Sequence, residues 1–143
     1  MKRIHARERY CLACRLCEIG CLVVHSKSRN VISAFRNERA AVVPAIRVEE
    51  SGGISFAVQC RHCADAPCLE ACISGALVRD GAMGAVVFDS ARCVGCWSCI
   101  MVCPAGAIAR GPERKVASKC DLCAGAETPA CVESCPNGAL VYE

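Results

Sequence analysis

The sequence predicts an α+β fold of short helices and small β-hairpins, arranged as two small modules of which one is nested inside the other. Three observations predict it. Sixteen of the 143 residues are cysteine, whereas Phe, Trp and Tyr contribute only 3, 1 and 2 residues. The cysteines fall into four groups of four, and a short motif repeats after three of these groups. With so few large side chains, we expect bound metal to hold the fold together.

The alternative scaffold for so many cysteines is a set of disulfides in a secreted protein. The basic stretch 1–9 is not followed by the apolar segment of a signal peptide, and no apolar run approaches the ~20 residues that span a bilayer. We therefore expect a cytoplasmic protein with no membrane span, in which clustered cysteines bind metal. The formal charge of +3 counts the cysteines as neutral, so it does not indicate a nucleic-acid partner.

Each cysteine group opens with Cys-x2-Cys and closes with x3-Cys. The groups are Cys11, Cys14, Cys17 and Cys21; Cys60, Cys63, Cys68 and Cys72; Cys93, Cys96, Cys99 and Cys103; and Cys120, Cys123, Cys131 and Cys135. This spacing is typical of two-cluster bacterial ferredoxins, in which three cysteines of a run hold one 4Fe–4S cluster and the fourth ligates the other. Four groups then predict four clusters. Zinc sites tend to use separated Cys-x2-Cys pairs, so a zinc-stabilised binding module is the alternative from another class.

The inner ferredoxin-like module is predicted over residues 59–110, which contain groups two and three. Between these groups the sequence indicates a strand, a turn at Asp80-Gly81 and a second strand. The fourth cysteine of each group is expected on a short helix that ends at the glycine of a C-x2-G-A-(L/I) repeat. Crossed ligation gives cluster B, held by Cys60, Cys63, Cys68 and Cys103, and cluster C, held by Cys93, Cys96, Cys99 and Cys72.

The outer ferredoxin-like module is predicted to join residues 1–30 with residues 111–143, which contain groups one and four. Its end strands, 3–6 and 139–142, can pair with each other. Crossed ligation gives cluster A, held by Cys11, Cys14, Cys17 and Cys135, and cluster D, held by Cys120, Cys123, Cys131 and Cys21. The competing arrangement pairs groups one with two and three with four, but the 38 residues from 22 to 59 make its first pairing less natural.

Residues 31–58 form an insertion between the modules. Alternation around Gly52-Gly53 predicts a hairpin over 46–58, whereas the basic stretch 26–39 indicates a solvated loop or, alternatively, a docking surface for a partner. Residues 111–115 indicate a basic turn. We expect His62 to pack beside a cluster or donate a hydrogen bond to sulfur, and Trp97 to shield a cluster from water. With no dinucleotide motif and all-cysteine ligation, the sequence predicts an electron relay between a donor and an acceptor protein.

On these residues the chain resembles the four-cluster electron-transfer subunits of molybdenum or tungsten oxidoreductases, formate–hydrogen systems and nickel carbon monoxide dehydrogenase. Residues 11–18, 56–63 and 93–104 look most like the iron–sulfur protein that serves nickel carbon monoxide dehydrogenase. The resemblance implies a subunit of an anaerobic oxidoreductase complex, with no substrate site of its own and with the nested cluster pairing. It implies electrons passing from carbon monoxide dehydrogenase to a hydrogenase or a flavin-dependent NAD(P) oxidoreductase. The rival is the electron-transfer small subunit of a tungsten or molybdenum enzyme acting on aldehyde or formate.

Overall fold

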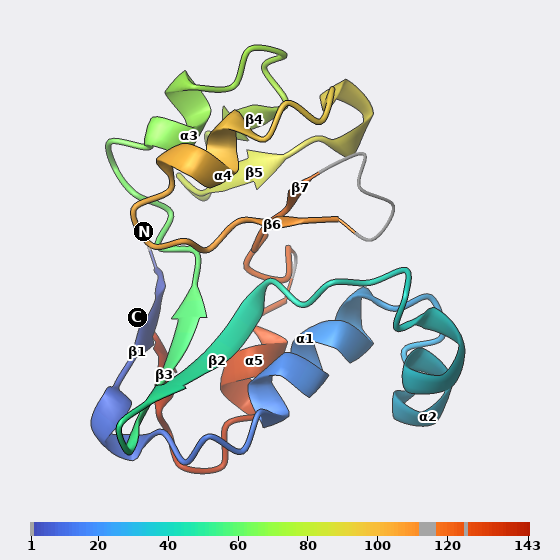
Figure 1. Ribbon diagram of the computed structural model, residues 1–143, viewed down its shortest axis with the longest axis vertical. Coiled ribbons are helices and arrows are strands. Elements are labelled where there is room, and N and C mark those ends of the chain that lie inside the picture. Colours follow the sequence, from blue (N-terminus) through green and yellow to red (C-terminus); the bar gives the residue numbers. More distant parts are fainter. Residues whose placement is uncertain (1, 112–116, 125) are drawn as a thin grey trace.

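The computed structural model describes residues 2–111, 117–124 and 126–143, in which short helices and strands alternate (Figure 1). The helices are α1 (Leu16–His25), α2 (Val31–Ser33), α3 (Pro67–Glu70), α4 (Ser98–Val102) and α5 (Ala130–Glu133). The strands are β1 (Ile4–Ala6), β2 (Ile46–Ser51), β3 (Ile54–Gln59), β4 (Leu77–Arg79), β5 (Val86–Phe88), β6 (Ala109–Arg110), β7 (Ala117–Ser118) and β8 (Leu140–Tyr142). Within the described ranges they form four two-stranded antiparallel sheets, which agrees with an α+β class.

The strands at the two ends of the chain lie side by side in the lower part of Figure 1. Strand β1 pairs with β8, with Ile4 opposite Tyr142 and Ala6 opposite Leu140, so the predicted pairing of the chain ends is confirmed. The predicted hairpin of the insertion is also present as β2 and β3. The side-chain amide of Gln59 donates to the carbonyl oxygen of Ile4 (3.0 Å) and so ties this hairpin to β1. Helices α1 and α5 pack against each other beside the hairpin.

The segment between cysteine groups two and three forms the upper part of Figure 1. Strands β4 and β5 pair from Leu77 opposite Phe88 to Arg79 opposite Val86, which confirms the predicted strand, turn and strand. The Asp80 carboxylate stabilises the turn by accepting the N–H groups of Ala82 and Met83 (3.0 and 2.6 Å). Helices α3 and α4 pack against each other next to this hairpin, and β6 and β7 cross the middle of the molecule.

The core is small and holds more sulfur than large apolar side chains. One buried cluster lies under β1, β2 and α1 and is built from Ile4, Cys17, Cys21, Ile46, Val48, Ala57, Ala85, Leu122, Cys131 and Leu140. A second surrounds Ala66, Leu77 and Val86. The largest side chains that are fully buried are those of His62, Val86 and Pro129. Such a core leaves a large role for groups bound by the cysteines.

Residues 31–38 of the polar stretch 26–39 are helical, so the expectation of a loop is wrong for this part, whereas residues 26–30 are irregular. Helix α2 continues into a π-helical segment, Ala34–Glu38. The Asn30 side chain accepts the N–H of Ser33 (3.1 Å) at its start, and the Glu38 carboxylate accepts the N–H groups of Lys27 and Ser28 (2.5 and 3.1 Å). These side chain–backbone bonds satisfy amides that water would otherwise solvate, and they stabilise a helix whose composition does not indicate one.

The fourth cysteine also lies elsewhere than expected in three groups. Only Cys21 is inside a helix, α1, whereas the corresponding cysteines of the other groups follow α3, α4 and α5 by one or two residues: Cys72, Cys103 and Cys135. The glycines that come next do have the expected left-handed backbone, with φ of 62°, 56° and 61° at Gly75, Gly106 and Gly138. The predicted basic turn lies, from residue 112 onward, outside the described residues. None of the described helices has the length and hydropathy needed to cross a bilayer.

Candidate metal-cluster sites

The cysteine loops adopt a strained backbone. In every group the residue before the second cysteine has positive φ: Ala13 (54°), His62 (45°), Gly95 (71°) and Leu122 (59°). Arg15, Trp97 and Cys123 share this conformation within the same loops. A non-glycine residue held there costs about 1–3 kcal/mol, and such turns gather backbone N–H groups into a concave anion site. The strain is therefore concentrated where a negatively charged group would bind.

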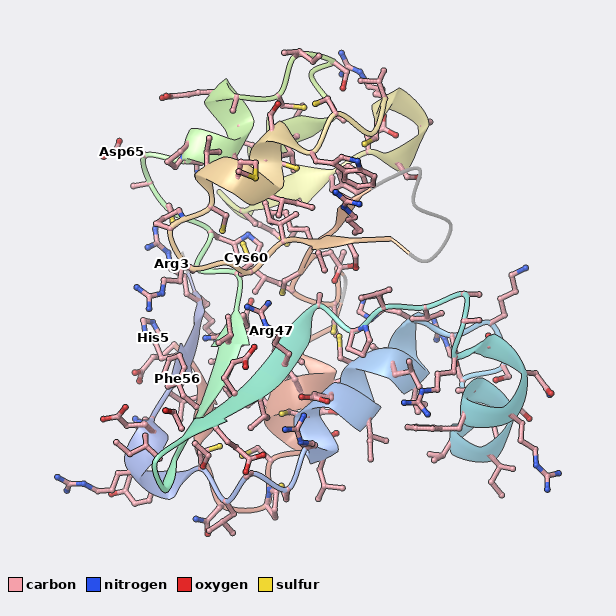
Figure 2. The ribbon with its side chains drawn as sticks, viewed as in Figure 1. Arg3, His5, Arg47, Phe56, Cys60 and Asp65 are labelled. Carbon is pink, nitrogen blue, oxygen red and sulfur yellow. The ribbon has the colours of Figure 1, made fainter. Side chains whose placement is uncertain are left out.

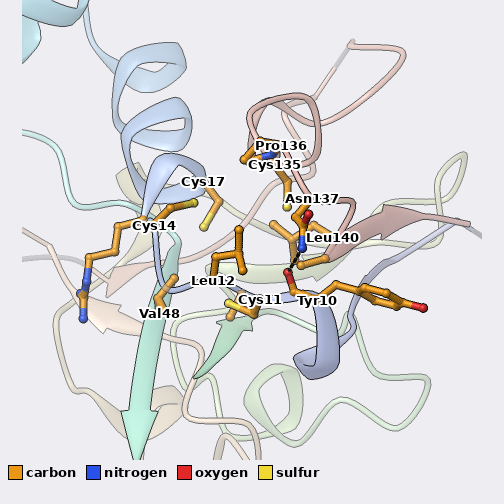
Figure 3. A pocket seen from close by; sticks show the side chains of 13 residues that line it. Tyr10, Cys11, Leu12, Cys14, Cys17, Val48, Cys135, Pro136, Asn137 and Leu140 are labelled. Carbon is orange, nitrogen blue, oxygen red and sulfur yellow. Dashed lines mark hydrogen bonds between the residues drawn. The ribbon is translucent and has the colours of Figure 1, made fainter. Parts of the chain in front are cut away.

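Cysteines from both ends of the chain face one cavity. Figure 3 shows Cys11, Cys14 and Cys17 of group one with Cys135 of group four around this cavity. Asn137 donates its side-chain amide to the carbonyl oxygen of Tyr10 (2.8 Å), which joins the two segments. Burial raises the pKa of Cys17 to about 11, and the nearby thiols of Cys135 and Cys14 add to the rise. The structure thus gathers the cysteines expected to hold cluster A.

A second cavity is lined by the complementary set, Cys21 with Cys120, Cys123 and Cys131. Burial raises the pKa of Cys120 to about 12 and raises that of Cys131 further. An empty site would therefore hold neutral thiols, and metal binding is what would deprotonate them. These are the cysteines expected to hold cluster D.

A histidine and a carboxylate stand at the edge of the second cavity. His25 Nε2 lies 3.1 Å from Asp121 Oδ1, and this contact raises the pKa of His25 to about 11. The ligand atoms of His25, Asp121 and Cys123 lie within 4.8 Å of one another, which would suit a single metal ion. Cys123 also faces the other three cysteines of the cavity, however, and four thiols favour an iron–sulfur cluster over a mixed site.

The other eight cysteines gather in the upper part of the molecule. Burial raises the pKa of Cys68, and the thiols of Cys60 and Cys103 raise it further. Likewise burial raises the pKa of Cys99, with Cys93, Cys72 and Cys96 contributing. The structure therefore brings Cys103 to group two and Cys72 to group three. Cys63 follows His62 in the loop that begins at Cys60.

Backbone amides donate to the sulfur atoms of five cysteines. The pairs are Ala45 N to Cys21 (3.3 Å), His62 N to Cys60 (3.4 Å), Ala76 N to Cys72 (3.2 Å), Ala107 N to Cys103 (3.4 Å) and Leu122 N to Cys120 (3.4 Å). Such bonds stabilise thiolate over thiol and are among the factors that set the potential of an iron–sulfur cluster.

The hydrogen bonds of His62 indicate whether these residues fit such a cluster. Its side chain is fully buried, and its Nδ1 accepts the N–H of Val86 (3.2 Å), so Nε2 carries the proton. Within the described ranges Nε2–H has no acceptor. Burial holds the pKa of His62 at about 4, so the ring stays neutral, and an unsatisfied buried donor costs about 1–3 kcal/mol. Cluster sulfur would accept a hydrogen bond from this N–H group, and all sixteen cysteines are free, so the site fits 4Fe–4S clusters.

Two further side chains lie near the cysteine sets. Trp97, at the N-terminus of α4, is half-buried, and the Arg110 guanidinium lies over its ring at 5.0 Å. Lys119 was missed by sequence reasoning. It is buried, and its Nζ donates to the carbonyl oxygens of Val86 and Cys120. It is one of four lysines in the chain, and nothing in the residues around it signals burial, so no sequence pattern could have identified it.

The comparison with known families agrees with this chemistry. Residues 53–143 match the family described as "4Fe-4S dicluster domain", a region that contains cysteine groups two to four. The chain also shares its fold with a subunit in the solved active-site complex BamBC of benzoyl coenzyme A reductase. That likeness has a TM-score of 0.56 and 23% identity and covers 100% of this chain and 76% of the other.

Three curated proteins are similar in sequence. The iron–sulfur protein of Rhodospirillum rubrum is 40% identical over 96% of this chain and 79% of its own length. The putative electron transport protein YsaA of Escherichia coli K12 is 40% identical over 91% and 82%. The putative oxidoreductase AegA of the same strain is 39% identical over 96% of this chain, which spans only 21% of AegA. With its cysteine sets and these likenesses, the chain belongs to the 4Fe-4S dicluster family of iron–sulfur proteins.

Proposed function

We propose that this protein is an electron relay that holds four 4Fe–4S clusters in crossed ligation, within two nested modules. The observation that carries the proposal is the pair of cavities in the outer part, each lined by three cysteines of one end group and the fourth of the other. The proximity of Cys103 to Cys68, and of Cys72 to Cys99, supports the same crossing for clusters B and C. Such clusters supply single-electron transfer, and full cysteine ligation leaves no iron open to a substrate.

Contacts between the four cysteine sets support the linear order A, D, B, C. Cys17 of set A lies close enough to Cys131 of set D to raise its pKa, and Cys60 of set B has the same effect on Cys120 of set D. Cys68 of set B and Cys99 of set C pack on the same apolar cluster around Leu77 and Val86. Each set therefore adjoins the next, as a relay along the long axis of the molecule requires.

The two terminal sets also reach the surface. Cys14 of set A and Cys96 of set C are the two cysteines classed as exposed among the sixteen. Exposed apolar side chains accompany them: Leu12 (66%) beside the first, and Val94 (66%) and Met101 (83%) beside the second. Apolar surface next to an exposed ligand suits contact with another redox protein. Electrons would enter at one end and leave at the other.

Nickel carbon monoxide dehydrogenase is the proposed donor, and a hydrogenase or a flavin-dependent NAD(P) oxidoreductase the proposed acceptor. This assignment is supported by the sequence resemblance at residues 11–18, 56–63 and 93–104. A tungsten or molybdenum oxidoreductase acting on aldehyde or formate would use the same four cysteine sets. Anaerobic affinity purification from native extract separates these partners, because the recovered large subunit contains either nickel or a molybdopterin-bound metal.

Counting iron tests the proposal directly. Anaerobically purified protein should contain about 16 Fe and 16 inorganic sulfide per chain, with visible absorption that dithionite bleaches. The variant Cys135→Ala should lose about four of those irons, because it removes one ligand of cluster A. About 8 Fe in the wild-type protein would limit it to two clusters. A colourless protein with zinc would instead support a zinc-stabilised binding module.

A further inference from the structure

Lys119 is buried where the upper and lower parts of the molecule meet. Its exposed fraction is 8%, and its Nζ donates to the carbonyl oxygen of Val86 in β5 and to that of Cys120 (3.0 Å). Val86 belongs to β5 in the upper part, whereas Cys120 lines the cavity of Cys21 and Cys131 in the lower part. Across the described ranges, none of the carboxylates forms an ion pair with Lys119. The ammonium group therefore joins the two parts through neutral acceptors only.

Lys119 contacts residues that belong to or pack beside two different sets. It donates to the carbonyl oxygen of Cys120, in set D, and to that of Val86. Val86 packs in the apolar cluster that includes Cys68 of set B. Figure 2 shows Cys60 at the level where the two parts meet. Lys119 therefore lies near the facing sides of sets B and D.

Strand β5 positions a second polar group at the same junction. The N–H of Val86 donates to His62 Nδ1 (3.2 Å), while the carbonyl oxygen of the same residue accepts from Lys119. One backbone residue thus orients both the unpaired imidazole N–H of the set B loop and the ammonium group. Two buried donors thus lie at the junction without an anionic partner among the described residues within hydrogen-bond distance, because Asp121, the carboxylate that acts on His62, contacts His25 instead.

A buried ammonium group without a carboxylate is unfavourable by several kcal/mol, and lysine is rarely buried unless it is paired. A 4Fe–4S cluster held by four thiolates is anionic in both redox states and gains one more negative charge on reduction. A fixed positive charge beside it therefore offsets its own burial cost and favours the reduced state.

We propose that Lys119 is the shared counter-charge of clusters B and D and raises the reduction potentials of both. The inference rests on the proposed cysteine ligation. Bound there, the two clusters would supply single-electron transfer from one to the other. No bond would be made or broken in such a transfer. Lys119 thus stabilises the reduced form of the cluster on either side of the junction between the two modules.

The test is a reductive titration of the full chain followed by electron paramagnetic resonance. Lys119→Gln keeps a donor for the two carbonyls but removes the charge. It should lower the equilibrium constant for reduction of two clusters about tenfold, which lowers their reduction potentials by about 59 mV for a one-electron couple. The affected signals should be those lost in Cys60→Ala and in Cys120→Ala. Lys119→Arg should restore the wild-type potentials. The matched control Lys27→Gln removes an exposed lysine and should leave all four potentials unchanged.

Unchanged potentials in a fully loaded Lys119→Gln protein would overturn the inference, as would an equal shift of all four clusters. If the Lys119→Gln protein contains less iron than the wild type, the identity of the lost clusters decides whether the inference holds. Selective loss of B and D, with full loading of Lys119→Arg, supports a counter-charge, whereas loss of A or C contradicts it. The iron and sulfide content of the wild-type protein separately tests the proposed function.

Discussion

Cys103 is the residue at which crossed ligation is tested most directly. It follows α4 by one residue, and its thiol lies near Cys68 of the preceding group. Cys103→Ala should therefore abolish the resonance signal that Cys68→Ala also abolishes, and lower the iron content by about four atoms. Cys99→Ala, in the same run as Cys103, is the matched control and should abolish a different signal, shared with Cys72→Ala. Loss of one common signal in Cys103→Ala and Cys99→Ala would contradict the crossing.

The ligand set could be predicted from the sequence because each cysteine run is local, with a spacing that suits one type of cluster. The residues around the ligands could not. His62 and Lys119 meet at Val86, which is 24 residues from the first and 33 from the second. Neither distance corresponds to a helical or strand period, so only the folded chain shows that a neutral imidazole and a charged lysine share one strand residue.

Among the elements, the two longer hairpins were predictable and the helical insertion was not. Gly52 and Gly53 have φ of 57° and 84°, which a turn between β2 and β3 requires and glycine adopts at little cost. The helical stretch 31–38 has only one turn of helical apolar spacing, at Val31, Ala34 and Phe35, which is too short to predict a helix. It depends instead on the Glu38 carboxylate, which reaches back to amides 10 and 11 residues earlier. A contact of that kind follows from the folded path of the chain rather than from local propensity.

Helix α1 packs against α5 through Gly20. A Cβ atom at this position would lie 2.2 Å from Ser134 Oγ and 3.0 Å from the carbonyl oxygen of Ala130. Because the second of these is backbone, Gly20→Val should force the two helices apart and lower the free energy of unfolding by about 1–3 kcal/mol. The measurement is the denaturant midpoint under anaerobic conditions, read from circular dichroism.

Gly81→Val is the matched control, because nothing lies within 4 Å of a Cβ atom built there. Its free energy of unfolding should stay within about 0.5 kcal/mol of the wild-type value, as is usual for surface substitutions. Equal midpoints for Gly20→Val and Gly81→Val would mean that α1 and α5 do not approach as closely as the structure has them.

At the scale of the whole molecule, the four cysteine sets differ in how many of their cysteines are buried. Set D has two buried cysteines, Cys21 and Cys131, whereas set C has none and includes the exposed Cys96. Sets A and B have one buried cysteine each, but set A also includes the exposed Cys14. The proposed order A, D, B, C therefore puts the two least protected sets at the ends, where electrons must enter and leave, and the better protected sets between them.

This gradient predicts the order in which a limiting oxidant destroys the clusters. Cluster C should be lost first and A second, so that iron falls from about 16 to a plateau near 8 per chain. The signals that remain should be those lost in Cys60→Ala and Cys120→Ala. Trp97→Ala should speed the loss of C alone, because Trp97 lies in the loop between Cys96 and Cys99 and is remote in sequence from set A. The oxidant must reach the iron and sulfide that the thiols enclose. Early loss of cluster B or D would therefore show that burial of the cysteines does not control how easily the oxidant reaches a cluster.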